Sequence, residues 1–91
     1  MQGKDLSAEV SELFQLPEKN YSQEIQTALE LAEHLQKKGY GFRLKDMCPK
    51  DIESNLWRAE FICPDEVTVS EDNESAARAV CLAAVRAFQL Q

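Results

Sequence analysis

The side chains best suited to chemistry are three cysteines and a single histidine: Cys48, Cys63, Cys81 and His34. Structural zinc sites take their ligands from close pairs, with about two to four residues between the two members. No two of these four residues have that spacing. The sequence therefore predicts no metal site, and the odd number of cysteines argues against a framework of disulfides.

Catalysis by these groups has little support. Cys48 precedes a proline and is expected in a loop, but no residue near it in sequence indicates a lowered thiol pKa. His34 falls at helical spacing with Thr27 and Glu30, on a face that we expect to be wet, and one exposed imidazole is not a general base. The three glycines form no phosphate-binding loop. We therefore expect no enzymatic activity and no cofactor.

A run of carboxylates in the last third of the chain is the clearest candidate for a binding surface. Its members are Asp65, Glu66, Glu71, Asp72 and Glu74. Solvation and the positive end of the following helix explain most of them. The functional alternative is an acidic patch that contacts a partner protein, with Asp65, Glu66, Glu71 and Asp72 as the candidate partner-binding residues.

Two other features have competing interpretations. Trp57 is in phase with Ala59 and Phe61 on a predicted strand, which favours a place in the core over a role in recognition. The polar segment 46–55 contains Met47 and Ile52. It is either a small contact site or a loop that tucks these two side chains against the sheet, and the sequence leaves both open.

Three helices and three strands must position these residues. The helices are predicted at about residues 5–14, 22–38 and 73–90, where apolar side chains recur at helical spacing. The strands are predicted at about 40–45, 56–63 and 66–70, where apolar and polar side chains alternate. Short links between the strands indicate an antiparallel meander. The prediction is one α+β domain over residues 1–91, in the order α-α-β-β-β-α.

The last helix is expected to lie directly on the sheet, because alanine allows close approach of the backbones. Its predicted packing side consists of Ala76, Ala77, Val80, Cys81, Ala83, Ala84, Val85, Ala87 and Phe88. Its predicted wet side consists of Arg78, Leu82, Arg86 and Gln89. Asp72 or Asn73 is the expected cap at its start.

The middle helix is expected to bury one apolar stripe, flanked by Leu31. The stripe consists of Ile25, Ala28, Leu29, Ala32 and Leu35. Asn20 with Gln23 has the form of a capping box, and Ser22 is a competing cap.

Composition restricts the partners of the protein. Its 91 residues carry 16 acidic and 10 basic side chains, a net charge of −6. That balance opposes direct binding of nucleic acid, which requires a concentrated basic face. It permits docking onto a basic protein surface that normally holds nucleic acid. We see no apolar run long enough for a membrane span and no secretion signal. The expectation is a cytoplasmic protein that does not bind membranes.

Several short segments resemble a known family when taken in order. They are Tyr21-Ser22-Gln23-Glu24-Ile25 after a proline, Gly39-Tyr40, Trp57-Arg58-Ala59-Glu60-Phe61, and Glu74-Ser75 followed by Ala79–Ala84. Together they are similar to the phage ABA-sandwich domain family of small bacteriophage and prophage proteins, over about Val10 to Phe88. The family name implies helices on both faces of the sheet. The charged residues on one face of the predicted strands favour helices on one side, and both arrangements stay open.

The resemblance carries no defined activity and no catalytic residues. It suggests a non-enzymatic phage or prophage accessory protein in the cytoplasm of a bacterial host. Such a protein would act by binding a host protein, and the most specific version is inhibition of a defence nuclease such as a CRISPR complex (an anti-CRISPR). The alternative is a structural or assembly component of the phage particle, or a small homo-oligomeric scaffold. A small enzyme that uses Cys48 or His34 ranks last.

Overall fold

The structure, a computed structural model of the chain, describes residues 6–47 and 55–90. Its elements are α1 (Leu6–Phe14), α2 (Ile25–Gln36), β1 (Gly41–Asp46), β2 (Trp57–Ile62), β3 (Thr68–Asn73) and α3 (Ala76–Gln89). The strands form one antiparallel sheet in the order β1-β2-β3. This confirms the predicted α+β class and element order. Cys48 and Ile52 lie outside the described residues.

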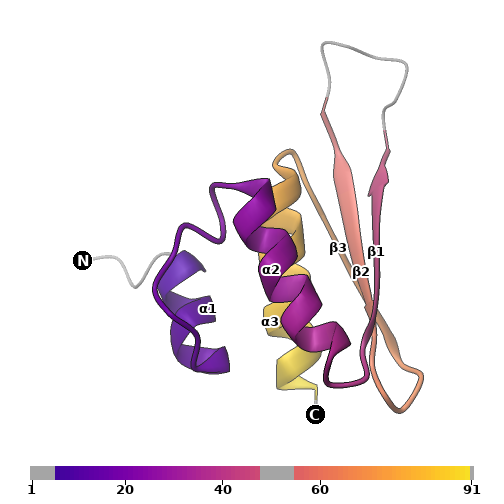
Figure 1. Cartoon of the computed structure of the whole chain (residues 1–91). Helices are drawn as coiled ribbons and strands as arrows, with labels where there is room; N and C mark the ends of the chain where they lie inside the picture. Colours follow the sequence, from indigo (N-terminus) through magenta and orange to yellow (C-terminus); the bar gives the residue numbers. More distant parts are fainter. Residues whose placement is uncertain (1–5, 48–54, 91) are drawn as a thin grey trace.

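The three helices lie on the same side of the sheet (Figure 1). α3 packs against β2 and β3, and α2 lies beside α3 and contacts β1. α1 packs on α3 from the side away from the sheet. Of the two arrangements that the sequence left open, the described residues therefore adopt the one-sided one. The other face of the sheet carries no helix in the part of the chain that the structure describes.

α3 is the centre of the packing. Eight of its residues are buried: Ala77, Ala79, Val80, Cys81, Ala83, Ala84, Val85 and Ala87. The predicted packing side is largely confirmed, although Ala76 is only half-buried, and two residues, Phe88 and Leu82, need correction. Phe88 is 40% exposed, and its ring meets the edge of Phe14 of α1 at a centroid distance of 5.0 Å. Leu82 is half-buried instead of wet. Because α1 also packs on α3, this helix has less surface in water than the sequence predicted.

α2 begins later and is rotated relative to the prediction. It starts at Ile25 after Glu24, whose side chain makes no capping hydrogen bond. Both predicted caps are therefore wrong. Ala28, Ala32 and Leu35 are buried as predicted. Leu31 and Thr27 complete the buried face of α2, because the helix leans on α3. Ile25 and Leu29, predicted in the core, are 39% and 41% exposed.

The predicted cap Ser22 is used in a tertiary contact. Its hydroxyl is 2.8 Å from the hydroxyl of Ser7 in α1, and its backbone N–H donates to the same Ser7 oxygen at 2.9 Å. Both serines are buried. This pair fixes the start of α1 against the turn that precedes α2.

We expect Ser7→Ala to lower the free energy of unfolding by about 1–2 kcal/mol, because it leaves a buried hydroxyl and a buried N–H without their partner. Urea denaturation followed by circular dichroism measures the loss. Ser70→Ala, at an exposed position of β3, is the control and should change stability by less than about 0.5 kcal/mol. Equal effects of the two variants would contradict the role assigned to Ser7.

β3 and the start of α3 are shifted toward the C-terminus. β3 covers Thr68–Asn73 and not 66–70, and it pairs with the whole of β2, from Ile62↔Thr68 to Trp57↔Asn73. Val67 is exposed in the turn, whereas Val69 is buried. Residues 72 and 73 are thus in a strand, and Ser75 is the cap of α3, accepting a hydrogen bond from the backbone N–H of Arg78 at 3.3 Å.

Candidate functional site

The two described thiols are packing groups. Cys63 follows β2 and Cys81 lies in α3, and both are buried. Burial raises the pKa of Cys81 to about 12, and burial and the nearby Asp65 raise the pKa of Cys63. Both side chains are therefore thiols at neutral pH, and a thiol is a poor nucleophile. In the described ranges no group of three or more histidine, cysteine or acidic residues could hold a metal ion.

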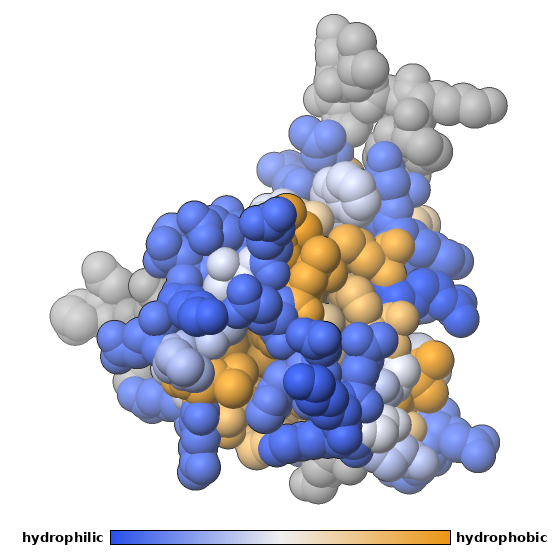
Figure 2. Space-filling view, in the orientation of Figure 1, coloured by the Kyte–Doolittle hydropathy of each residue, from blue (hydrophilic) through white to orange (hydrophobic). Residues whose placement is uncertain are grey.

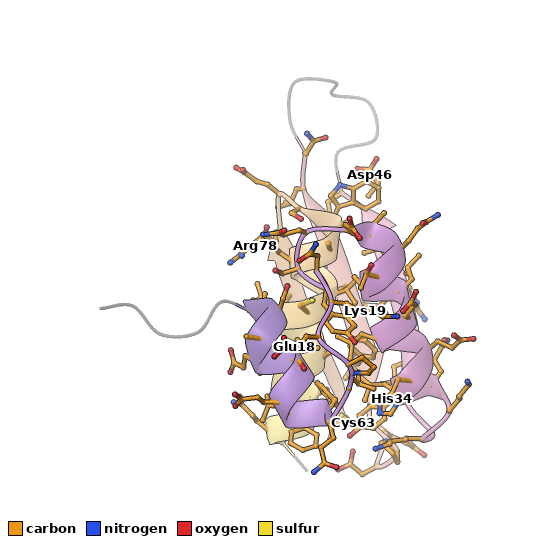
Figure 3. All side chains as sticks on the ribbon, turned by 60° about the vertical axis from the view of Figure 1, so that its left-hand side comes forward. Glu18, Lys19, His34, Asp46, Cys63 and Arg78 are labelled. Carbon is orange, nitrogen blue, oxygen red and sulfur yellow. The ribbon has the colours of Figure 1, made fainter. Side chains whose placement is uncertain are left out.

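His34 does not lie on a wet face as predicted. It is half-buried between α2 and the connector that follows α1 (Figure 3). The ring of Phe14 stands edge-on to it at 6.3 Å, and its Nε2 is buried without a hydrogen-bond partner among the described residues. Burial, followed by the charges of Lys38 and Lys37, lowers the pKa of His34. The imidazole is therefore neutral near pH 7.

This lowered pKa predicts a dependence of stability on pH. Because the pKa is lower in the folded state than the ordinary 6.5, the unfolded chain binds the proton more readily. The stabilisation by neutral His34 is complete above about pH 6.5 and is lost as the pH falls through the lowered folded pKa. We expect denaturation midpoints of the wild type and His34→Gln to run in parallel above pH 6.5 and to converge or cross below it. Parallel curves down to pH 5 would contradict the prediction.

The four acidic residues predicted to bind a partner do not form one patch. Asp65 and Glu66 lie exposed in the turn between β2 and β3. Glu71 and Asp72 lie toward the other end of β3 and, as neighbours on a strand, point to opposite faces. The structure thus separates the turn pair from the strand pair, and their role in binding stays a prediction.

Glu71 and Asp72 are also paired within the chain. Glu71 accepts a hydrogen bond from Arg86 of α3 at 2.7 Å. Asp72 accepts two from the guanidinium of Arg58, at 2.7 and 3.0 Å, which hold the pKa of the Asp72 carboxyl below its usual range. These two carboxylates offer less free charge to a partner than those of the turn.

The sheet surface that faces away from the helices, which we call the open face, is mainly polar, although it includes the half-buried Ile62. Its charged members are Arg43, Lys45, Arg58, Glu60 and Asp72. Arg43 lies opposite Glu60, with 3.6 Å between Nη1 and Oε1. Lys45 lies opposite Arg58, which is already bound to Asp72. Within the described part of the chain Lys45 has no ion-pair partner, so the β1 side of the open face is basic.

On the helix side, a shallow hollow lies between α2 and β1, and we call it the α2–β1 groove. Its volume is about 350 Å³, and its lining residues are Gln26, Leu29, Glu30, Ala32, Glu33, Gln36 and Phe42. The exposed Ile25 extends the apolar surface along α2. Figure 2 shows apolar surface between α2 and the sheet on this side of the molecule. The helical periodicity of the sequence predicted that Ile25 and Leu29 are buried in the core, so the sequence did not predict this groove.

The comparison with known families gives a match over most of the chain. The phage ABA sandwich domain family has a model that matches residues 4–85. The chain belongs to the phage ABA sandwich domain family. This confirms the resemblance carried by the short motifs. Comparison with curated proteins and with solved structures gives no match.

The family match covers both surfaces described above. The α2–β1 groove and the open face of this phage ABA sandwich domain lie entirely within residues 4–85. No described helix is long and apolar enough to cross a bilayer. In this ABA sandwich domain the open face and the α2–β1 groove meet at β1, which is an edge strand of the described sheet.

Proposed function

We propose that this phage ABA sandwich domain is a non-enzymatic accessory protein that acts by binding a host protein in the host cytoplasm. The α2–β1 groove is the observation that supports the proposal. Leu29, which lines the groove together with the half-buried Phe42, and Ile25, one helical turn before Leu29, are both about 40% exposed. Clustered apolar surface of this kind on a small domain is typical of protein–protein contact sites.

The finer version of the proposal is inhibition of a defence nuclease such as a CRISPR complex. The net charge of −6 suits a protein that competes with nucleic acid for a basic groove without binding nucleic acid itself. In this version Asp65 and Glu66, exposed in the turn, contribute free negative charge. Glu71 and Asp72 contribute less, since arginines of the same chain already bind them.

The test is retention of one identified host protein on the immobilised chain, compared between two matched variants. Leu29→Arg places a charge in the groove, whereas Val67→Arg places the same charge at an exposed valine of the β2–β3 turn. Loss of the host protein with Leu29→Arg and its retention with Val67→Arg support the proposal. Retention by both variants overturns the groove as the contact surface. If charge reversal at Asp65 and Glu66 leaves retention of the host protein unchanged, the acidic residues of the turn do not contribute to binding.

The second candidate is a structural or assembly component of the phage particle, or a small oligomeric scaffold. The observation that favours it is the sheet itself, whose described strands leave β1 and β3 as unpaired edges that could join copies. Light scattering at high concentration and the protein composition of purified virions test it. A strict monomer that is absent from virions counts against this candidate.

A further inference from the structure

We infer that β1 accepts an extended segment of a partner protein as a fourth strand of the sheet, and that this segment alternates apolar and acidic residues. The inference rests on the proposed function and specifies the mode of binding and the chemistry of the partner. It depends on three properties of β1: its free backbone edge, the groove on its helix side and the unmatched basic charge on its open face.

The backbone of β1 is a regular template. It pairs with β2 over six consecutive residues without a bulge, from Gly41↔Ile62 to Asp46↔Trp57. No described strand lies on its other side, so every second residue directs its N–H and C=O away from the sheet. An extended peptide can bind to such an edge through main-chain hydrogen bonds, while side-chain pockets give specificity.

The helix side of this edge selects apolar residues. α3 covers β2 and β3, whereas α2 covers β1 only in part and leaves Phe42 and Leu44 half-buried. A strand added beside β1 would lie along the groove next to Leu29 and Ile25 of α2. Its helix-facing side chains would fill the hollow of about 350 Å³ and remove these aliphatic groups from water.

The open face selects acidic residues. Lys45 lies opposite Arg58, a like-charge pair across two strands, and Arg58 is already bound to Asp72. The side chain of Arg43 is 58% exposed, and its Nη1 lies 3.6 Å from Oε1 of Glu60, so much of its surface is accessible to a further acidic group. An acidic side chain on the added strand would stand beside each basic one. Since strand side chains alternate, the segment has apolar residues on one face and acidic residues on the other.

The same charges disfavour a second copy of this chain as the occupant. Antiparallel pairing of two β1 strands places residues of the same face opposite one another, so Arg43 and Lys45 would meet basic residues. The other edge strand, β3, offers acidic side chains, but Glu71 and Asp72 are bound to Arg86 and Arg58. A different protein therefore supplies the strand.

The experiment uses synthetic nine-residue peptides and the full isotope-labelled chain. The probe alternates valine and glutamate; one control peptide replaces glutamate by lysine, and a second keeps the composition but groups the valines together. We expect measurable binding of the alternating acidic peptide alone. Amide exchange should slow at every second residue of β1 when it binds. No binding, equal binding of the lysine peptide, or protection that spares β1 overturns the inference, as does self-association of the chain.

The decisive variant is Lys45→Glu, with Lys38→Glu as the matched control at an exposed lysine outside the sheet. Lys45→Glu turns an attraction into a repulsion, so the acidic peptide should bind roughly tenfold more weakly and the lysine peptide more strongly. The fold should be retained, because the new carboxylate lies opposite Arg58. Lys38→Glu should change neither affinity. Equal affinity of wild type and Lys45→Glu for the acidic peptide overturns the inference.

The same variants separate this inference from the proposed function. If the host protein is lost with Leu29→Arg but fully retained with Lys45→Glu, the groove binds a partner without strand addition, and only the inference fails. If the host protein is retained by both variants, the groove is not the contact surface, and both fail. If the host protein is lost with Leu29→Arg and with Lys45→Glu but is retained by Lys38→Glu and Val67→Arg, the result supports both the proposed function and the inference.

Discussion

Replacement of Phe61 by alanine is expected to lower the free energy of unfolding by about 3–5 kcal/mol. Phe61 has no exposed surface and lies on the central strand β2, between Phe42 of β1 and Val69 of β3. Its ring is 5.0 Å from that of Phe42. Alanine would leave a cavity between the sheet and α3 that neighbouring strands cannot close, since both are paired to β2.

The loss is large for a domain of this size, whose total stability is typically about 5–15 kcal/mol. Urea denaturation of the two proteins at the same pH measures the difference. Phe88→Ala is the control, because Phe88 is partly exposed near the end of α3, and it should cost clearly less. If the two variants were equally stable, Phe61 would not be the centre of the core.

Ala83→Leu is expected to destabilise the fold by about 3 kcal/mol, at the upper end of the cost that overpacking usually carries. Ala83 has no exposed surface, and α3 is enclosed by the sheet on one side and by α1 and α2 on others. Leucine adds three carbon atoms at a position where the helix can move only by displacing one of these layers. The same mutation at Gln89, an exposed position of α3, tests helix propensity alone.

Thermal unfolding of Ala83→Leu and Gln89→Leu distinguishes packing from propensity. We expect the melting temperature to fall by many degrees with the first and to change little with the second. A stable Ala83→Leu protein would mean that α3 does not approach its neighbours closely, which contradicts the burial of its alanines.

Periodicity predicted the class, the order and the packing side of α3, because local spacing determines which residues of one element share a face. It could not predict how far each element is rotated about its axis. Ile25 and Leu29 fit the predicted apolar stripe of the helix as well as Leu31 does. Of these three only Leu31 is buried, because α2 packs against α3. Ser22 is a residue type that often caps helices. Its hydrogen bond with Ser7 instead depends on how α1 packs against the turn before α2, which the local sequence does not indicate.

The candidate site shows the same limit. Glu71 and Asp72 follow Asp65 and Glu66 closely in the sequence, and this clustering alone predicts one acidic patch. The strand continues through them, so one reaches Arg86 and the other reaches Arg58 on the opposite face. The ion pairs of these carboxylates and the α2–β1 groove beside Phe42 both arise from packing between elements. A single sequence does not indicate that packing.

The position of α3 in the chain has a consequence for biosynthesis. Among the described elements, α1 docks on α3, and the same helix makes the main helical cover of β2 and β3. During translation the first two helices and the sheet would therefore emerge from the ribosome before the element that joins them exists. We expect a nascent chain that stops before Ala76 to remain unstructured and to be degraded, and folding to begin only when the final turns of α3 leave the exit tunnel.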